Sequence, residues 1–102
     1  MFDQIKTQTF VWQGITIEVR FAPYWLGHTG PHQIAHLDIT AIAPERHPLP
    51  ITETGYRSHF LPREAVEEQG GAEAFVRAWL DHDAKSSAWA QTLAERRQLS
   101  FF

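Results

Sequence analysis

The chain has 102 residues, 43% of them hydrophobic and 13% aromatic, which is enough for one hydrophobic core and too little for two domains. Twelve acidic residues against nine basic ones give a net charge of -3, which argues against strong binding to the phosphates of nucleic acid. The chain contains no cysteine, so it has no disulfide, no thiolate zinc site and no cysteine nucleophile.

Alternating hydrophobic residues mark the first part of the chain. In the stretch "TFVWQGITIEVRFA", the residues Ile15, Ile17, Val19 and Phe21 fall on one face. The pair Gln13–Gly14 supplies a turn, because glycine accepts the positive φ that a tight hairpin needs. We therefore expect two strands joined at this turn.

The stretch "QIAHLDITAIA" alternates in the same way and predicts a third, half-buried strand. Its inward positions are Ala35, Leu37, Ile39 and Ala41, and its outward positions are His36, Asp38 and Thr40. The following "PERHPLP" ends the strand, because proline cannot donate a hydrogen bond to a strand ladder. A shorter fourth strand is expected over "GYRSHF".

From Arg63 onward the hydrophobic spacing becomes helical. The residues that carry this spacing are Phe75, Trp79 and Leu80, then Trp89 and Leu93. The pattern predicts two helices, with room for a short third helix before them at "REAVEEQ". Either Ser86 or Ser87 is expected to cap the last helix.

Strands first and helices last are typical of an α+β domain. We expect an antiparallel sheet of three to four strands, followed by two to three C-terminal helices packed on one face. The last helix should end by about Arg97, because no hydrophobic stripe continues beyond it. The predicted organisation is one globular domain over residues 1–97 and a flexible tail over residues 98–102. No stretch has the apolar character of a signal peptide or a membrane span, so a cytoplasmic protein without membrane contact is expected.

The predicted tail reads "QLSFF". The amide of Gln98 can both donate and accept a hydrogen bond, and Leu99, Phe101 and Phe102 offer large hydrophobic surfaces to a partner. This pentapeptide resembles the motif that binds the bacterial sliding clamp, the DNA polymerase III beta subunit, whose common form is Gln-Leu-Ser/Asp-Leu-Phe. The resemblance covers five of the 102 residues.

The resemblance implies a role for each residue of the tail. Gln98 would take the glutamine position and Leu99 the leucine pocket, Ser100 would be the small spacer, and Phe102 the terminal aromatic residue. Phe101 stands where the motif prefers leucine. The implied function is a non-enzymatic accessory protein of bacterial DNA replication, repair or mobile-element maintenance, recruited to the clamp with micromolar affinity. The alternative is that the terminal hydrophobic residues complete the core.

The remainder of the chain bears a general resemblance, without a defining motif, to small proteins carried by plasmids and mobile elements of proteobacteria. It would bind nucleic acid directly only weakly, because its net charge is negative.

A rival hypothesis, a small enzyme or a domain that binds an anionic ligand, centres on "ITETGYRSHF". Within seven residues, Glu53, Arg57 and His59 supply an acid, a fixed cation and a potential general base, with Tyr56 beside them. No nucleophile motif or phosphate loop accompanies them, so a solvated strand face is the competing interpretation.

The histidines His28, His32 and His36 are spaced four apart, but Gly30 and Pro31 interrupt any helix that would align them. We therefore predict solvated histidines, with no metal and no cofactor.

Of the four tryptophans, Trp79 and Trp89 are predicted to be core residues, because they follow the helical spacing. Trp12 and Trp25, near a turn and in a loop, are predicted to face a partner or a nucleobase. Arg20 and Asp38 are predicted to face each other across neighbouring strands.

Overall fold

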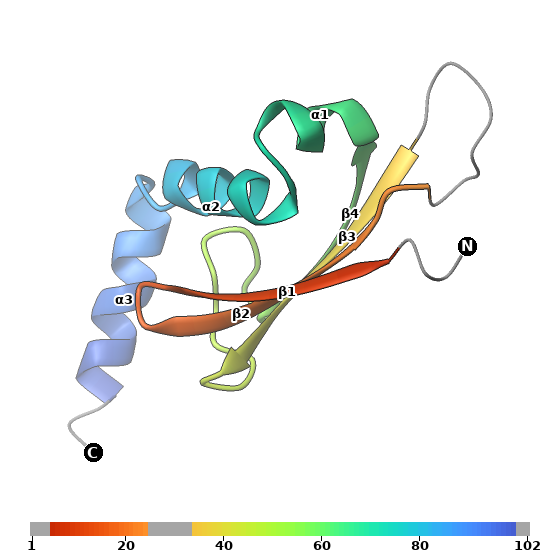
Figure 1. The fold of residues 1–102 in the computed structure, drawn as a ribbon. Coiled ribbons are helices and arrows are strands. Elements are labelled where there is room, and N and C mark those ends of the chain that lie inside the picture. The colour runs from red at the N-terminus through yellow and green to blue at the C-terminus, as the bar shows by residue number, and fades with distance from the viewer. Residues whose placement is uncertain (1–4, 25–33, 100–102) are drawn as a thin grey trace.

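The computed structural model describes residues 5–24 and 34–99, which form a four-stranded antiparallel sheet and three helices (Figure 1). The strands are β1 (Lys6–Trp12), β2 (Ile15–Ala22), β3 (Ile34–Ala43) and β4 (Tyr56–Pro62), and they lie side by side in chain order. The helices are α1 (Arg63–Glu68), α2 (Ala72–Asp83) and α3 (Ser87–Leu99). The predicted α+β class is confirmed.

The β1–β2 hairpin turns at the predicted pair. Gln13 and Gly14 both have positive φ, at 48° and 78°. Two consecutive residues in this conformation match the twist of antiparallel strands and close a two-residue turn. The turn sets the register in which Trp12 pairs with Ile15.

One face of the sheet carries the core. Ile17 and Val19 of β2 are completely buried, and so are Val76 and Leu80 of α2. The inward positions predicted for the third strand are confirmed, since all four are buried: Ala35, Leu37, Ile39 and Ala41. Helix α2 packs against β1 and β2, and α1 packs against β4, so both helices cover this face (Figure 1).

The opposite face of the sheet, here called the open face, carries the outward residues of the four strands. Its large hydrophobic side chains remain accessible: Phe60 is 53% exposed, Tyr56 41% and Val11 58%. Polar and charged residues lie between them, because β2 and β3 pair Arg20 with Asp38 and Glu18 with Thr40. The predicted cross-strand placement of Arg20 and Asp38 is confirmed.

The segment between β3 and β4 folds back as a compact loop. Leu49 and Ile51 of this loop are buried in the core. The carbonyl of Gly55 accepts a hydrogen bond from the backbone N–H of Ala41 at 2.8 Å, which ties the end of the loop to β3. Gly55 has a φ of 78°, in the left-handed region that favours glycine.

Helix α3 begins as predicted, since the Ser86 side chain accepts a hydrogen bond from the backbone N–H of Trp89 at 3.2 Å. Trp89 is buried and Leu93 is partly buried, whereas residues 94–96 are exposed. The helical backbone continues to Leu99, two residues beyond the expected end at Arg97, because helix boundaries depend on the last hydrogen-bonded turn rather than on a hydrophobic stripe. Within residues 5–24 and 34–99, no helix is long and apolar enough to cross a membrane.

Candidate functional site

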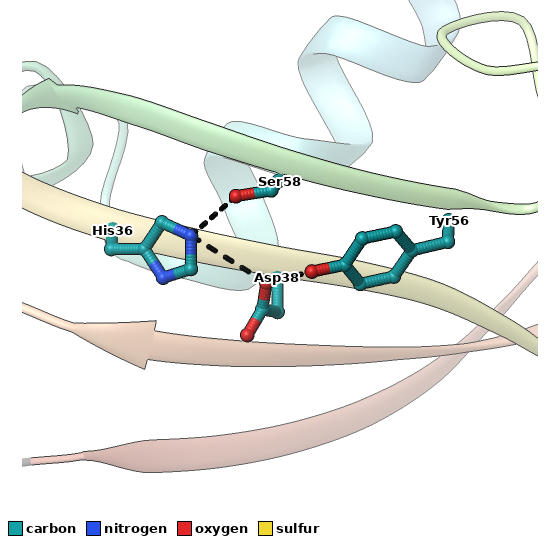
Figure 2. Close-up of polar contacts among 4 residues, drawn as sticks. All are labelled: His36, Asp38, Tyr56 and Ser58. Atoms are coloured by element: carbon teal, nitrogen blue, oxygen red, sulfur yellow. Dashed lines mark hydrogen bonds and ion pairs between the residues drawn. The ribbon is translucent and has the colours of Figure 1, made fainter.

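A network of polar side chains lies on the open face between β3 and β4. The ring Nε2 of His36 lies 2.6 Å from the hydroxyl of Ser58 and 3.5 Å from Oδ1 of Asp38. The phenol of Tyr56 donates a hydrogen bond to the same Oδ1 at 2.7 Å. Figure 2 shows these four side chains converging, with the second oxygen of the Asp38 carboxylate pointing away from Tyr56 and His36.

The register of the sheet brings this network together. Asp38 is paired with Ser58 across β3 and β4, and His36 is paired with Phe60. The His36 and Phe60 rings lie 4.6 Å apart, between centroids. His36 is only 8% exposed, and its ring packs against that of Phe60, so the prediction of a solvated histidine is wrong at this position.

The residue types Ser, His and Asp invite comparison with a hydrolytic triad. In a triad, the histidine contacts serine through one ring nitrogen and the carboxylate through the other. Here both Ser58 and Asp38 approach Nε2 of His36. Among the described residues, the arrangement is therefore a hydrogen-bond network around the Asp38 carboxylate, without the geometry that activates a serine nucleophile.

A depression of about 200 Å³ lies beside this network. It is lined by Arg20 and Ala22 of β2, by His36 and Asp38 of β3, and by Ile5 just before β1. The cation and the carboxylate come from neighbouring strands, directly opposite each other. A ligand in this depression would meet a positive and a negative group side by side.

The hydrogen bond to Asp38 raises the pKa of Tyr56 above its ordinary value of 10.0, and the nearby negative charge acts in the same direction. A carboxylate that accepts a hydrogen bond from the phenol favours the neutral phenol over the phenolate. Tyr56 therefore remains a hydrogen-bond donor to Asp38 throughout the physiological pH range.

Replacing Asp38 with asparagine should lower the pKa of Tyr56 toward the ordinary value, because the charged acceptor is removed. Ser58→Ala should raise that pKa further, since the Ser58 hydroxyl stabilises the phenolate. Titration of the tyrosine ring resonances by NMR, in a Tyr24→Phe background, measures both shifts. Equal midpoints in the parent and the two variants would show that the network does not hold Tyr56.

The structure separates the residues of the predicted ligand site. Tyr56 lies on the open face, whereas Arg57 and His59 point to the face that the helices cover. Glu53 lies in the β3–β4 loop, where it lines a depression with residues of that loop and of α3 that include neither Arg57 nor His59.

Arg57 and His59 both contact Trp79 of α2. The Arg57 guanidinium lies 5.3 Å from the Trp79 ring centroid and donates a hydrogen bond to the carbonyl of Ile51 at 3.0 Å. The His59 ring lies 4.6 Å from the Trp79 ring. Burial lowers the pKa of His59 below its ordinary value, and the positive charge of Arg57 lowers it further. Both side chains thus join β4 to α2.

Of the three histidines weighed as metal ligands, His28 and His32 lie outside the described residues. His36 belongs to the open-face network. Among residues 5–24 and 34–99, no group of three or more His, Cys, Asp or Glu residues is placed to hold a metal ion.

The prediction that Trp12 faces a partner is wrong. Trp12 is 5% exposed, and its indole N–H donates a hydrogen bond to the carboxylate of Asp81 at 2.8 Å. Its ring lies 5.8 Å from that of Trp89. The position next to a turn is buried because α2 and α3 meet over this end of the hairpin. Trp25 lies outside the described residues.

The predicted clamp-binding peptide is only partly within the described residues. The backbone of Gln98 and Leu99 forms the end of α3, and Ser100, Phe101 and Phe102 lie outside the described part.

The sequence did not predict the open-face network, although the alternation of its strands contains part of the pattern. Alternation placed His36 and Asp38 outward on one predicted strand and Tyr56 and Ser58 together on the next. The missing information was the register that sets Asp38 opposite Ser58.

The chain is similar to a known protein family. The model of the family described as the KlcB third domain matches residues 5–89, which span all four strands, α1, α2 and the start of α3. No curated protein and no solved structure matches the chain. Because the matched residues make up most of the sequence, the chain belongs to the KlcB third-domain family.

Proposed function

We propose that this domain is a non-enzymatic accessory module that residues Gln98–Phe102 recruit to the bacterial sliding clamp. KlcB is a plasmid-associated accessory protein, and membership of its family supports an accessory role in plasmid maintenance. The family match ends at residue 89, so the clamp-type pentapeptide belongs to a segment beyond the shared domain.

The proposal rests on the direction in which helix α3 runs and on the exposure of its last described side chains. The helix is anchored at its start by Trp89 and Leu93, and its side chains at residues 94–96 are exposed. Figure 1 shows the C-terminal end of α3 extending away from the sheet. The described end of α3 leaves the core, which supports a role for the pentapeptide in binding a partner.

Binding requires the last turn of α3 to open, because a peptide of this type binds in an extended form. Gln98 and Leu99 are the last two residues of the helix. Terminal turns fray at little free-energy cost, so this opening subtracts little from the affinity. Burial of Leu99 and the two terminal phenylalanines in the clamp would supply the favourable free energy of binding.

The test is a calorimetric titration of a bacterial sliding clamp with the full chain and with a copy that ends at Arg97. We expect micromolar binding by the full chain and none by the shortened copy. Because residues 94–96 are already exposed, the truncation should change the free energy of unfolding by less than about 1 kcal/mol.

Two variants sharpen this experiment. Gln98→Ala combined with Leu99→Ala should abolish binding as the truncation does, whereas Phe101→Leu, which restores the common motif, should bind at least as well as the parent. A full chain that does not bind the clamp at high micromolar concentration would refute recruitment. So would a truncation that unfolds the domain, since the tail would then belong to the core.

A further inference from the structure

The depression on the open face has a lining that recruitment through α3 does not use. A guanidinium from Arg20 and a carboxylate from Asp38 stand on adjacent strands at its edge. Ile5 and Ala22 supply hydrophobic surface, and the His36 imidazole supplies an aromatic ring. We propose that this depression binds a single guanine base.

The Asp38 carboxylate is held ready for a ligand. Among the described residues, its contacts with Tyr56 and His36 both involve Oδ1. Figure 2 shows the other oxygen directed away from these two partners. The Tyr56 phenol thus orients the carboxylate while leaving Oδ2 to accept further hydrogen bonds.

Guanine has the edge that this pair of charges matches. Its N1–H and its exocyclic amino group are adjacent donors for a carboxylate, and its O6 is an acceptor for a guanidinium. Adenine would turn its N1 acceptor toward Asp38, and cytosine has one donor group beside two acceptors. The neighbouring cation and anion therefore favour guanine over adenine and cytosine.

The size of the depression favours one base over a longer ligand. Its volume of about 200 Å³ is below the roughly 300 Å³ at which sites for drug-sized ligands begin. Flat bases pack against aromatic and hydrophobic surfaces, which His36, Ala22 and Ile5 provide here.

Charge on the open face favours an uncharged form of the ligand. Glu18 projects from β2 on the same face, two positions from Arg20, and adds a negative charge near the depression. With a net charge of -3, the chain does not attract a polyanion. The nucleoside guanosine is thus preferred over a phosphorylated strand.

The test is an NMR titration of the full chain, followed through backbone amides, with guanosine and with adenosine. Guanosine should cause saturable shifts at Ala22, His36 and Asp38, and adenosine should not. A short single strand with one guanine among thymines separates the two sources of the base. Equal or weaker binding by the strand identifies the free nucleoside as the ligand, and tighter binding identifies a base within a strand.

Variants decide whether the two charges recognise the base. Asp38→Asn and Arg20→Gln should each weaken guanosine binding by about fivefold or more, since a paired contact to a base edge discriminates at least that strongly. Glu18→Gln, on the same strand and face but outside the lining, is the matched control and should change the affinity less than about twofold. Arg20 is exposed, so its variant reports on binding even if Asp38→Asn is unstable.

Three results would overturn the proposal. These are the absence of saturable shifts at millimolar guanosine, equal shifts with adenosine, and undiminished binding by Arg20→Gln.

Discussion

Gly55→Ala should destabilise the domain by about 2–4 kcal/mol, measured by urea unfolding followed through tryptophan fluorescence. A Cβ at this position would lie 2.6 Å from the backbone carbonyl carbon of Arg46 and 2.7 Å from its Cα. Backbone cannot move aside as a flexible side chain does, so the loop would have to shift. That shift would stretch the hydrogen bond between Ala41 and Gly55 and disturb the buried Leu49.

Gly14→Ala is the matched control for this prediction. Gly14 has the same φ of 78°, but a Cβ there would meet nothing within 4 Å. Gly14→Ala should lower the free energy of unfolding only by the cost of placing alanine in the left-handed region, about 1–2 kcal/mol. The excess loss in Gly55→Ala measures the overlap with Arg46. Equal losses in the two variants would show that the β3–β4 loop adapts freely.

Alternation was sufficient to predict the strands, because a half-buried sheet requires it. The inward positions of β3 are all buried, and β4 follows the predicted alternation of Tyr56 and Ser58 against Arg57 and His59. Helical spacing likewise indicated α2, where Leu80 is completely buried. These patterns are local, so the sequence displays them directly.

The roles of particular side chains were harder to predict, because they depend on what packs over each face. Arg57 and His59 were predicted as a fixed cation and a potential general base of a ligand site, yet helix α2 places the Trp79 ring against both. Asp38 gained its partners through the β3–β4 register, which alternation does not specify. Arg57 and His59 differ from Asp38 in which distant residues the fold brings beside them, and residue type does not reveal those neighbours.

The two proposed interactions use separate parts of the molecule. The proposed clamp-binding peptide begins in the last turn of α3, whereas the proposed guanine site lies on the open face, opposite the face that α1 and α2 cover. Truncation at Arg97 should therefore leave guanosine binding unchanged, and Arg20→Gln should leave clamp binding unchanged. Each proposal fails or stands by its own measurement.

Trp12→Ala should cost about 3–5 kcal/mol of the free energy of unfolding, as expected for a large aromatic residue removed from a core. Trp12 is 5% exposed and packs on Trp89, so the variant leaves a cavity where the hairpin meets α3. A tryptophan that served a partner would instead be replaceable with little effect on stability. A loss below about 1 kcal/mol in chemical unfolding would contradict the core role.

Phenylalanine variants at Trp12 and at its neighbour Trp89 isolate the contribution of the hydrogen bond to this loss of stability. Both replacements remove a similar part of the ring, but Trp12 loses a bond to Asp81, whereas the buried Nε1 of Trp89 has no hydrogen-bond partner among the described residues. Removing an unpaired donor relieves a desolvation cost, while removing a paired one forfeits a favourable contact. Trp12→Phe should therefore be more destabilising than Trp89→Phe by about 1–2 kcal/mol. The reverse order would mean that the bond between Trp12 and Asp81 contributes nothing to the junction of β1 and α2.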